Sequence, residues 1–161
     1  MDQFTSLFYG AIVSQILEDV QDPVETTKIL HKLGQQMGEK MADYYFTMVL
    51  LNNQDLPQCK QFIQTSDGVV QYLSFILGVS CIVSSQEELS YQIKLEENPF
   101  ESFVKVPNQL TGLCYSTVIP GAISGALKAV GWSATSSIIQ KDSSWIIDVK
   151  RTSSVLDIAG K

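Results

Sequence analysis

Residues 110–132, "LTGLCYSTVIPGAISGALKAVGW", decide how this chain folds. About 20 of them carry Lys128 as their only charge, which is long enough for a helix that spans a bilayer. Pro120 and several small or hydroxyl side chains keep the hydrophobicity of the stretch modest, namely Gly112, Gly121, Gly125, Ser116, Thr117 and Ser124. A helix that is apolar all round lies in a protein core or in a membrane. We therefore predict a fully buried helix in a soluble protein.

Two β-rich runs precede the buried helix and two follow it. "VSCIVSS" (79–85) and "LSYQIKLEE" (89–97) come before it, and "SATSSIIQ" (133–140) and "SWIIDVKR" (144–151) come after it. These runs are rich in the β-branched and aromatic residues that favour strands, and short polar stretches separate the members of each pair. The pattern predicts one β-hairpin on each side of the buried helix.

Two long helices are expected near the N-terminus. Apolar residues recur at three- and four-residue spacing over about residues 3–20 and again over 24–51, which predicts amphipathic helices. Asp22 is placed to cap the second helix, and Pro23 fits its first turn.

A third helix is predicted to start at Asp55 and Pro57 and to end at Gly78. This start places Cys59 in the first turn, where unpaired N–H groups and the helix dipole lower the pKa of a cysteine from about 8.5. Cys59 is therefore a candidate nucleophile or attachment point. A free cysteine also commonly fills space in a core, and the local sequence leaves both interpretations open.

The expected order of elements is ααα-ββ-α-ββ. Runs of helices with paired strands, rather than strict βαβ alternation, indicate the α+β class, with an antiparallel sheet covered on one face by about four helices. A chain of 161 residues buries enough surface to need no disulfide or metal for its core. We expect residues 1–151 to form a single domain and residues 152–161 to be a flexible tail.

The composition excludes several classes of protein. Hydrophobic residues make up 45% and charged residues 17%, which does not fit a disordered chain. The net charge of −6 and the single arginine, Arg151, provide no basic surface for nucleic acid. The N-terminal "MDQFTSLFYG" lacks the basic region of a secretory signal, and three cysteines without paired spacing favour a reducing compartment. We expect a cytoplasmic location.

The residues that commonly carry catalysis do not form a set in this sequence. A thiol enzyme that used Cys59 would need a base, and His31, the only histidine, lies off the apolar stripe of its helix. The other two cysteines show no metal-ligand spacing, so no metal is expected. "GQQMG" (34–38) and "GAISG" (121–125) do not follow strands as a phosphate loop does, and they indicate close helix packing. No catalytic residue is predicted.

Four motifs resemble those of the small core subunits of TRAPP, the transport protein particle that tethers vesicles. They are "LFYGAIVSQIL" (7–17), "LHKLGQQMG" (30–38), "EENPFESFVKVP" (96–107) and "YSTVIPGAISGALKAV" (115–130). They occur in the family's order and near its spacing. The resemblance runs from about Phe4 to Arg151.

The chain looks most like the "Bet-three" class of that family, which carries a fatty acid thioester-linked to a cysteine at the start of its third helix. "YGAIVSQI" (9–16) and "QCKQF" (58–62) favour this class, and Cys59 is the matching cysteine. The "LHKLGQQMG" motif also resembles the sister subunit that pairs with it. The resemblance implies palmitate on Cys59 and no other cofactor.

The resemblance also implies a fold, partners and a place in the cell. It implies a four-stranded antiparallel sheet and a homodimer or heterodimer, built through the helices, with other small TRAPP-like subunits. The implied role is that of a non-catalytic scaffold for activating the Rab GTPase of endoplasmic reticulum to Golgi transport. Such a subunit is peripheral at Golgi or endoplasmic reticulum membranes, and its own membrane contact is only indirect.

A buried acyl chain would act as part of the core. At about 0.8 kcal/mol per CH₂, sixteen carbons offset on the order of 10 kcal/mol of the cost of forming a channel. The candidate lining residues are Phe62, Ile63, Ser66, Val70, Leu73, Gly34, Gly38 and Gly121, where the glycines either leave a tunnel or let helices approach. Val70, Leu73 and the nearby Tyr72 are bulky for an open channel, and Pro120 is expected to kink the buried helix.

Two other functions are compatible with the residues. The first is a free-standing α+β domain that binds a small apolar molecule or a lipid without a covalent bond. The second is a thiol enzyme that uses Cys59, which requires a lowered thiol pKa and a base within hydrogen-bond reach.

Overall fold

The computed structural model describes residues 3–55, 59–101, 106–107, 109–141 and 144–152. The first three helices are α1 (Gln3–Val20), α2 (Pro23–Leu51) and α3 (Thr65–Leu77), with a short 3-10 helix η1 (Phe62–Gln64) before α3. The remaining elements are β1 (Cys81–Glu87), β2 (Ser90–Leu95), a 3-10 helix η2 (Tyr115–Thr117), α4 (Val118–Ala129), β3 (Ala134–Lys141) and β4 (Ser144–Arg151). This order confirms the predicted ααα-ββ-α-ββ arrangement.

The strands form one four-stranded antiparallel sheet in the order β1-β2-β4-β3. The two hairpins join through β2 and β4, where Ile93 lies opposite Ile147. Alternate residues of these central strands are almost completely buried, namely Tyr91, Ile93, Leu95, Ile147 and Val149. This alternation shows that one face of the sheet carries the core.

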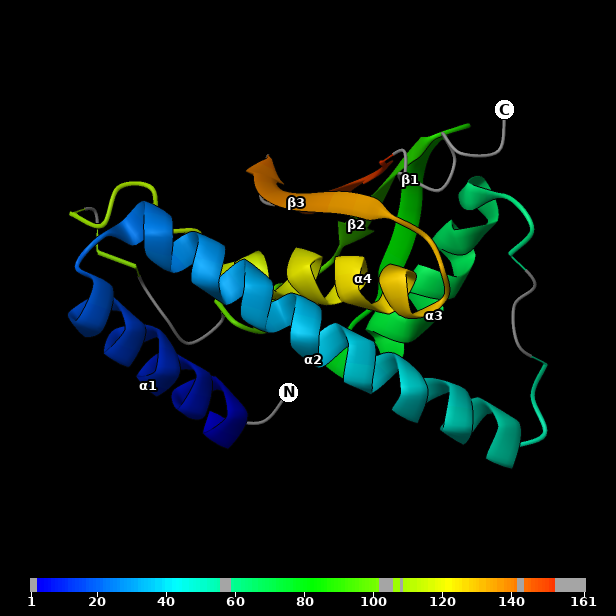
Figure 1. The fold of residues 1–161 in the computed structure, drawn as a ribbon, viewed down its shortest axis with the longest axis horizontal. Helices are drawn as coiled ribbons and strands as arrows, with labels where there is room; N and C mark the ends of the chain where they lie inside the picture. Colours follow the sequence, from blue (N-terminus) through cyan, green and yellow to red (C-terminus); the bar gives the residue numbers. More distant parts are fainter. Residues whose placement is uncertain (1–2, 56–58, 102–105, 108, 142–143, 153–161) are drawn as a thin grey trace.

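The helices cover that one face of the sheet (Figure 1). Helix α3 packs against β1, and α4 packs against β3. Helix α2 crosses α4 on the side away from the sheet, and α1 lies beside α2. The α+β class, with helices on one face of an antiparallel sheet, is confirmed.

The N-terminus of α2 forms as its sequence predicts. The Asp22 carboxylate accepts a hydrogen bond of 2.9 Å from the backbone N–H of Val24, and Pro23 occupies the first helical position. Proline is tolerated there because that N–H would have no partner within the helix.

The decisive stretch 110–132 contains a buried helix, but a short one. All residues of α4 from Val118 to Leu127 are buried. Pro120 is the third residue of α4 and therefore lies in its first turn, where backbone N–H groups have no intrahelical partner. Pro120 therefore does not interrupt the middle of α4, which starts only at Val118. No helix in the described part of the chain has the length and apolarity needed to cross a membrane.

Glycines allow α2 and α4 to cross with their backbones in contact. A Cβ atom added to any of these glycines would collide with the backbone of the other helix: Gly34 with Val118, Gly38 with Ala122, Gly121 with His31, and Gly125 with Gln35. The space beside each glycine is therefore filled by backbone atoms. Of the two roles expected for them, the structure shows close helix approach, and Gly34, Gly38 and Gly121 are not among the walls of the cavity beside Cys59.

Candidate functional site

Cys59 lies before its helix and not within it. The chain enters α3 through η1, which begins at Phe62, so the predicted start at Asp55 and Pro57 is too early. Asp55 has no regular secondary structure, and Pro57 is outside the described residues. Cys59 therefore does not occupy the first helical turn in which the sequence placed it.

Gln64 organises the turn that carries Cys59. Its side-chain Oε1 accepts hydrogen bonds from the backbone N–H of Lys60 at 2.8 Å and of Gln61 at 3.1 Å. The Cys59 Sγ donates to the backbone carbonyl of Gln64 at 3.6 Å. One glutamine thus fixes the backbone on the C-terminal side of the cysteine and accepts from its thiol.

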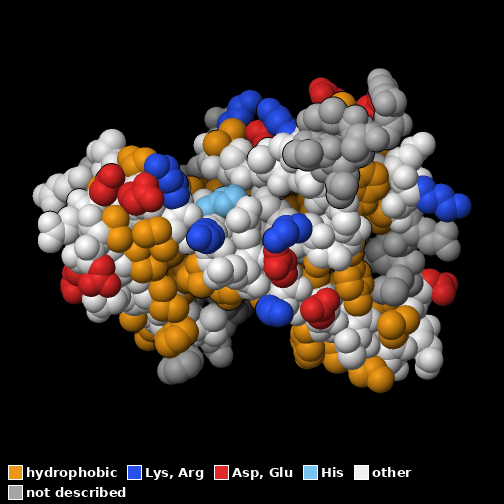
Figure 2. Space-filling model, in the orientation of Figure 1, with side chains coloured by type: hydrophobic (Ala, Val, Ile, Leu, Met, Phe, Trp, Pro, Cys, Tyr) orange, Lys and Arg blue, Asp and Glu red, His pale blue; other side chains and the backbone are white. Residues whose placement is uncertain are grey.

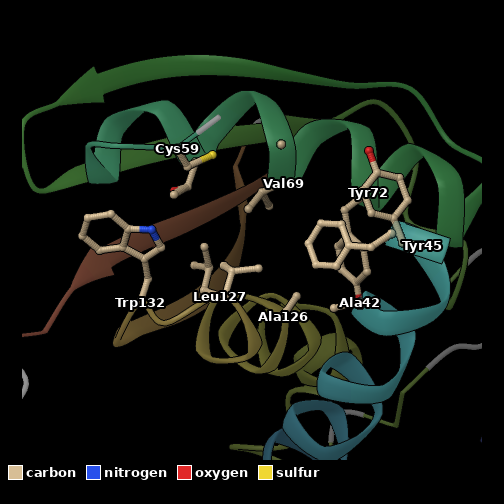
Figure 3. A pocket seen from close by; sticks show the side chains of 12 residues that line it. Ala42, Tyr45, Cys59, Val69, Tyr72, Ala126, Leu127 and Trp132 are labelled. Carbon is tan, nitrogen blue, oxygen red and sulfur yellow. The ribbon is translucent and has the colours of Figure 1, made fainter. Parts of the chain in front are cut away.

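Cys59 is one wall of an apolar cavity of about 260 Å³. Figure 3 shows Cys59 and Trp132 at one end of this cavity, whereas Tyr45 and Tyr72 lie at the other end. The complete lining comes from α2, α3, α4 and the segments that flank them: Ala42, Tyr45, Phe46, Cys59, Thr65, Gly68, Val69, Tyr72, Ala126, Leu127, Val130 and Trp132. We call this space the Cys59 cavity.

The cysteine also reaches the surface. A second depression, of about 370 Å³, is lined by Cys59, Trp132, Arg151 and Thr152, among others. The Arg151 guanidinium lies over the Trp132 ring, 5.1 Å from its centroid, which is a cation–π contact. Cys59 therefore occupies the boundary between an internal apolar space and a polar opening.

The surroundings of Cys59 raise the pKa of its thiol. Burial is the largest cause, because it disfavours the charged thiolate, and the negative charge of Asp67 adds to it. The lowered pKa predicted from a helix-start position is therefore wrong, because these surroundings disfavour the thiolate.

The chain matches the family described as transport protein particle (TRAPP) component over residues 5–159. It belongs to the TRAPP family. A trafficking protein particle complex subunit 3 homolog from Caenorhabditis briggsae is 40% identical over 129 residues, which are 77% of this chain and 69% of the relative. Subunit 3 of Dictyostelium discoideum is 27% identical over 129 residues, 78% of this chain and 67% of that protein. The predicted family is confirmed.

A solved TRAPP structure has the same fold. The crystal structure of a trafficking protein particle complex subunit 3 from Naegleria fowleri, covalently bound to palmitic acid, superposes with a TM-score of 0.82 at 26% identity. The match covers 93% of this chain and 94% of that one.

The lining residues predicted on the third helix are rotated away from the Cys59 cavity. Phe62, Ile63, Ser66, Val70 and Leu73 are not among its walls. The predicted face includes residues that meet the sheet: the Ser66 hydroxyl accepts a hydrogen bond of 2.6 Å from the side chain of Gln86 in β1. The walls from α3 are instead Thr65, Gly68, Val69 and Tyr72, about one position away along the helix.

Phe62 still belongs to the surroundings of the Cys59 cavity. Its ring lies 5.7 Å from that of Trp132 and 5.4 Å from that of Tyr91. The Tyr91 hydroxyl pairs with the Thr65 hydroxyl at 3.0 Å. Phe62 thus contacts the lining residue Trp132 directly and is linked to the lining residue Thr65 through Tyr91.

Sequence reasoning missed the walls that come from other helices. Ala42 and Tyr45 belong to α2, Ala126 and Leu127 belong to α4, and Trp132 follows α4. The sequence contained one usable signal, because alanines at buried positions of apolar helices leave room beside them. Without the crossing of α2 and α4, nothing in the sequence relates these residues to Cys59.

The histidine considered as a base for Cys59 does not line its cavity. His31 is half-buried on α2, its backbone carbonyl faces Gly121 of α4, and it is not a wall of the Cys59 cavity. Cys81 is the first residue of β1, and Cys114 directly precedes η2. Burial raises the pKa of both thiols. Among the described residues, no three His, Cys, Asp or Glu side chains come together as metal ligands.

Proposed function

We propose that this chain is a non-catalytic core subunit of a vesicle-tethering complex of the TRAPP type and that it carries a fatty acid, palmitate in the first instance, on Cys59. The observation that supports this most directly is a cysteine at the mouth of an apolar cavity, in a chain whose solved relative is covalently bound to palmitic acid. The cavity supplies the apolar surroundings that an acyl chain requires.

Attachment exchanges one thioester for another. The Cys59 sulfur attacks the carbonyl carbon of an acyl thioester such as acyl coenzyme A, and a new S–C bond forms as the S–C bond to the carrier breaks. The carrier thiolate leaves and takes up the proton that Cys59 loses. Each methylene buried in the cavity contributes about 0.8 kcal/mol, so the acyl chain stabilises the fold that holds it.

The environment of Cys59 favours storage over turnover. Its thiol pKa is raised, and His31, the only histidine of the chain, does not line the cavity. A thiol enzyme needs a thiolate and a nearby base. The proposed subunit therefore contributes surfaces and a bound lipid, and not a catalytic step, to its complex.

Assembly is proposed to use the helical side of the molecule. Figure 2 shows hydrophobic side chains over α1 and over the end of α2, with charged side chains between them. Exposed members of this set are Leu7, Phe8, Tyr44, Leu50 and Leu51. We propose that they pack against other small TRAPP-like subunits as a homodimer or heterodimer. The assembled complex, peripheral at Golgi or endoplasmic reticulum membranes, then supports activation of a Rab GTPase in transport between them.

Intact mass of natively purified protein tests the lipid proposal. We expect a mass increase of one fatty-acyl group that hydroxylamine removes and that is lost in Cys59→Ser. Cys114→Ser is the matched control and should keep the adduct, because Cys114 is not a wall of the Cys59 cavity. An unmodified wild-type thiol would contradict the covalent proposal, and a hydroxylamine-resistant, non-covalent lipid would favour the free-standing binding domain instead.

Affinity purification tests the scaffold proposal. The tagged chain, purified from cells that express it naturally, should bring down other small TRAPP subunits in fixed proportion. A chain that is recovered alone would contradict the scaffold role without affecting the result on Cys59.

A further inference from the structure

A second apolar cavity lies near the Cys59 cavity. It has a volume of about 190 Å³, is lined by residues of α1, α2, α3 and α4, and is partly open to the surface at Phe8 and Met37. Its walls include Met37 and Met41 of α2, Ile76 of α3 and Ala122 of α4. We call it the methionine cavity.

The two cavities follow the same faces of three helices. On α2, the walls of the methionine cavity at Leu33, Met37 and Met41 are continued at four-residue spacing by Tyr45 of the Cys59 cavity. On α3, Val69 and Tyr72 are continued by Ile76, and on α4, Ala126 is continued by Ala122. Residues three or four apart lie on one side of a helix. The cavities therefore lie end to end along one seam between the helices.

Two tyrosines lie at the end of the Cys59 cavity that is away from Cys59 (Figure 3). The Tyr45 and Tyr72 rings meet edge to face with centroids 5.8 Å apart. The Tyr72 hydroxyl donates to the Gly38 carbonyl at 3.4 Å, and the Tyr45 hydroxyl donates to the Gln71 side chain at 3.3 Å. Both distances are long for hydrogen bonds between these groups, so the hydroxyls are weakly held and ring packing, which for Tyr45 includes Phe46 and Phe75, keeps the rings in place.

We propose that Tyr45 and Tyr72 form a gate that sets the length of the acyl chain held by Cys59. With the rings in place, a medium-length chain fills the Cys59 cavity alone. A sixteen-carbon chain displaces the rings and continues into the methionine cavity. This inference rests on the proposed attachment of a fatty acid to Cys59, and it adds the residues that select among fatty acids.

The energetic basis is the burial of methylene groups beyond the gate. Each further methylene that enters an apolar cavity favours the attached chain roughly fourfold. Methylenes that cannot pass the tyrosines gain nothing, and those that pass them must first displace two packed rings. The ratio of long to medium chains on Cys59 therefore reports the state of the gate.

The test measures this ratio at equilibrium. Purified protein is first deacylated with hydroxylamine and then incubated with equal concentrations of decanoyl and palmitoyl coenzyme A, and the two adducts are quantified by intact mass. We expect Tyr72→Ala to raise the palmitoyl-to-decanoyl ratio by at least fourfold, because the junction is opened. Met41→Trp, which fills the methionine cavity beyond the gate, should lower the ratio by a comparable factor.

Ile139→Ala is the matched control. Ile139 is 50% exposed on β3 and is not a wall of either cavity, so this variant should keep the wild-type ratio. Thermal unfolding checks that each variant is folded, and Tyr72→Leu replaces Tyr72→Ala if that variant is not.

Two results would overturn the inference in distinguishable ways. Adducts that form on Cys59 with the same ratio in the wild type, Tyr72→Ala and Met41→Trp would refute the gate and leave the attachment proposal intact. A wild-type protein that forms no hydroxylamine-sensitive adduct with either thioester would refute the attachment proposal, and the gate with it.

Discussion

Two effects act on the sulfur atom of Cys59 in the same direction. Burial and the Asp67 carboxylate both disfavour a negative charge on it, and no helix N-terminus offsets them because Cys59 precedes η1. A thioester carries no charge and so avoids both penalties. The site is consequently better suited to hold an acylated sulfur than a free thiolate.

The contribution of Asp67 can be measured separately. Asp67→Asn removes one negative charge with little change of shape, so the pKa of Cys59 should fall and its thiolate fraction should rise. We expect iodoacetamide to label Cys59 about twofold faster at mildly alkaline pH, the size typical of one exposed charge. The difference should shrink as salt is added. Peptide mapping by mass spectrometry gives the rate at Cys59.

Asp43→Asn is the control for this measurement. Asp43 is an exposed carboxylate on α2 and does not contribute to the pKa shift of Cys59. Equal labelling rates in Asp67→Asn and the wild type would show that burial alone determines the reactivity of the thiol.

At the scale of elements, the crossing of α2 and α4 holds the cavity walls in place. The four glycines let the helix backbones touch, and residues just beyond them, Ala42 on α2 and Ala126 on α4, line the Cys59 cavity. Protein interiors are packed at the density of organic crystals, so a crossing this tight cannot absorb added atoms. The same contact that brings the helices together thus determines where the cavity begins.

Adding one methyl group at this crossing should destabilise the fold. In Gly125→Ala, the new Cβ would collide with the Gln35 backbone, which cannot rotate away as a side chain can. We expect a loss of about 3 kcal/mol in the free energy of unfolding, at the upper end for overpacking. Urea unfolding followed by circular dichroism measures it.

Gly10→Ala provides the matched comparison. Gly10 is also helical, but a Cβ there would lie 3.4 Å from the Tyr115 hydroxyl, which is ordinary contact. Alanine is favoured over glycine in helices by up to about 1 kcal/mol, so this variant should be neutral or more stable. Similar losses in both variants would mean that the crossing tolerates the methyl group.

At the scale of the whole molecule, the sheet and the helices expose different surfaces. The helical side carries the large apolar side chains of α1 and of the end of α2, whereas polar residues dominate the exposed side of β3. Single exposed apolar residues are normal, but a local group of large ones, as over α1 and over the end of α2, is typical of an interaction surface. The proposed assembly would bury this set against another subunit.

A charge in the helical surface should weaken assembly. Leu7 is 73% exposed on α1, so Leu7→Glu leaves the core intact and places a carboxylate in the proposed interface. We expect association with a partner subunit, or with a second copy, to weaken about tenfold, as for an interface hot spot. Light scattering after size exclusion measures the assembled mass.

Ile82→Glu is the control for assembly. Ile82 is 53% exposed on β1, in the sheet and away from α1, and this variant should assemble normally. If Ile82→Glu dissociates the assembly and Leu7→Glu does not, the interface lies on the sheet and the proposed helical interface is wrong.

Local sequence determined much of this protein. The Asp22 cap followed by Pro23 starts α2, Gly78 in a left-handed conformation ends α3, and alternation in β2 and β4 marks the buried face of the sheet. These features act within a few residues along the chain, so they can be recognised without a fold. The family resemblance extended them to the sheet topology and to the choice of Cys59.

Tertiary structure alone decided the chemistry of Cys59. The chain enters α3 through a 3-10 turn, which moves the cysteine out of the helix start, and the negative charge of Asp67 helps to raise its pKa. The walls of its cavity come from three helices. The crossing of α2 and α4 determines which side of each of these two helices lines the cavity. Burial and electrostatic interaction depend on distances through space, whereas caps and periodicity depend on distances along the chain. For that reason the sequence identified the cysteine, and only the fold determined its pKa, its cavity and the tyrosines at the far end.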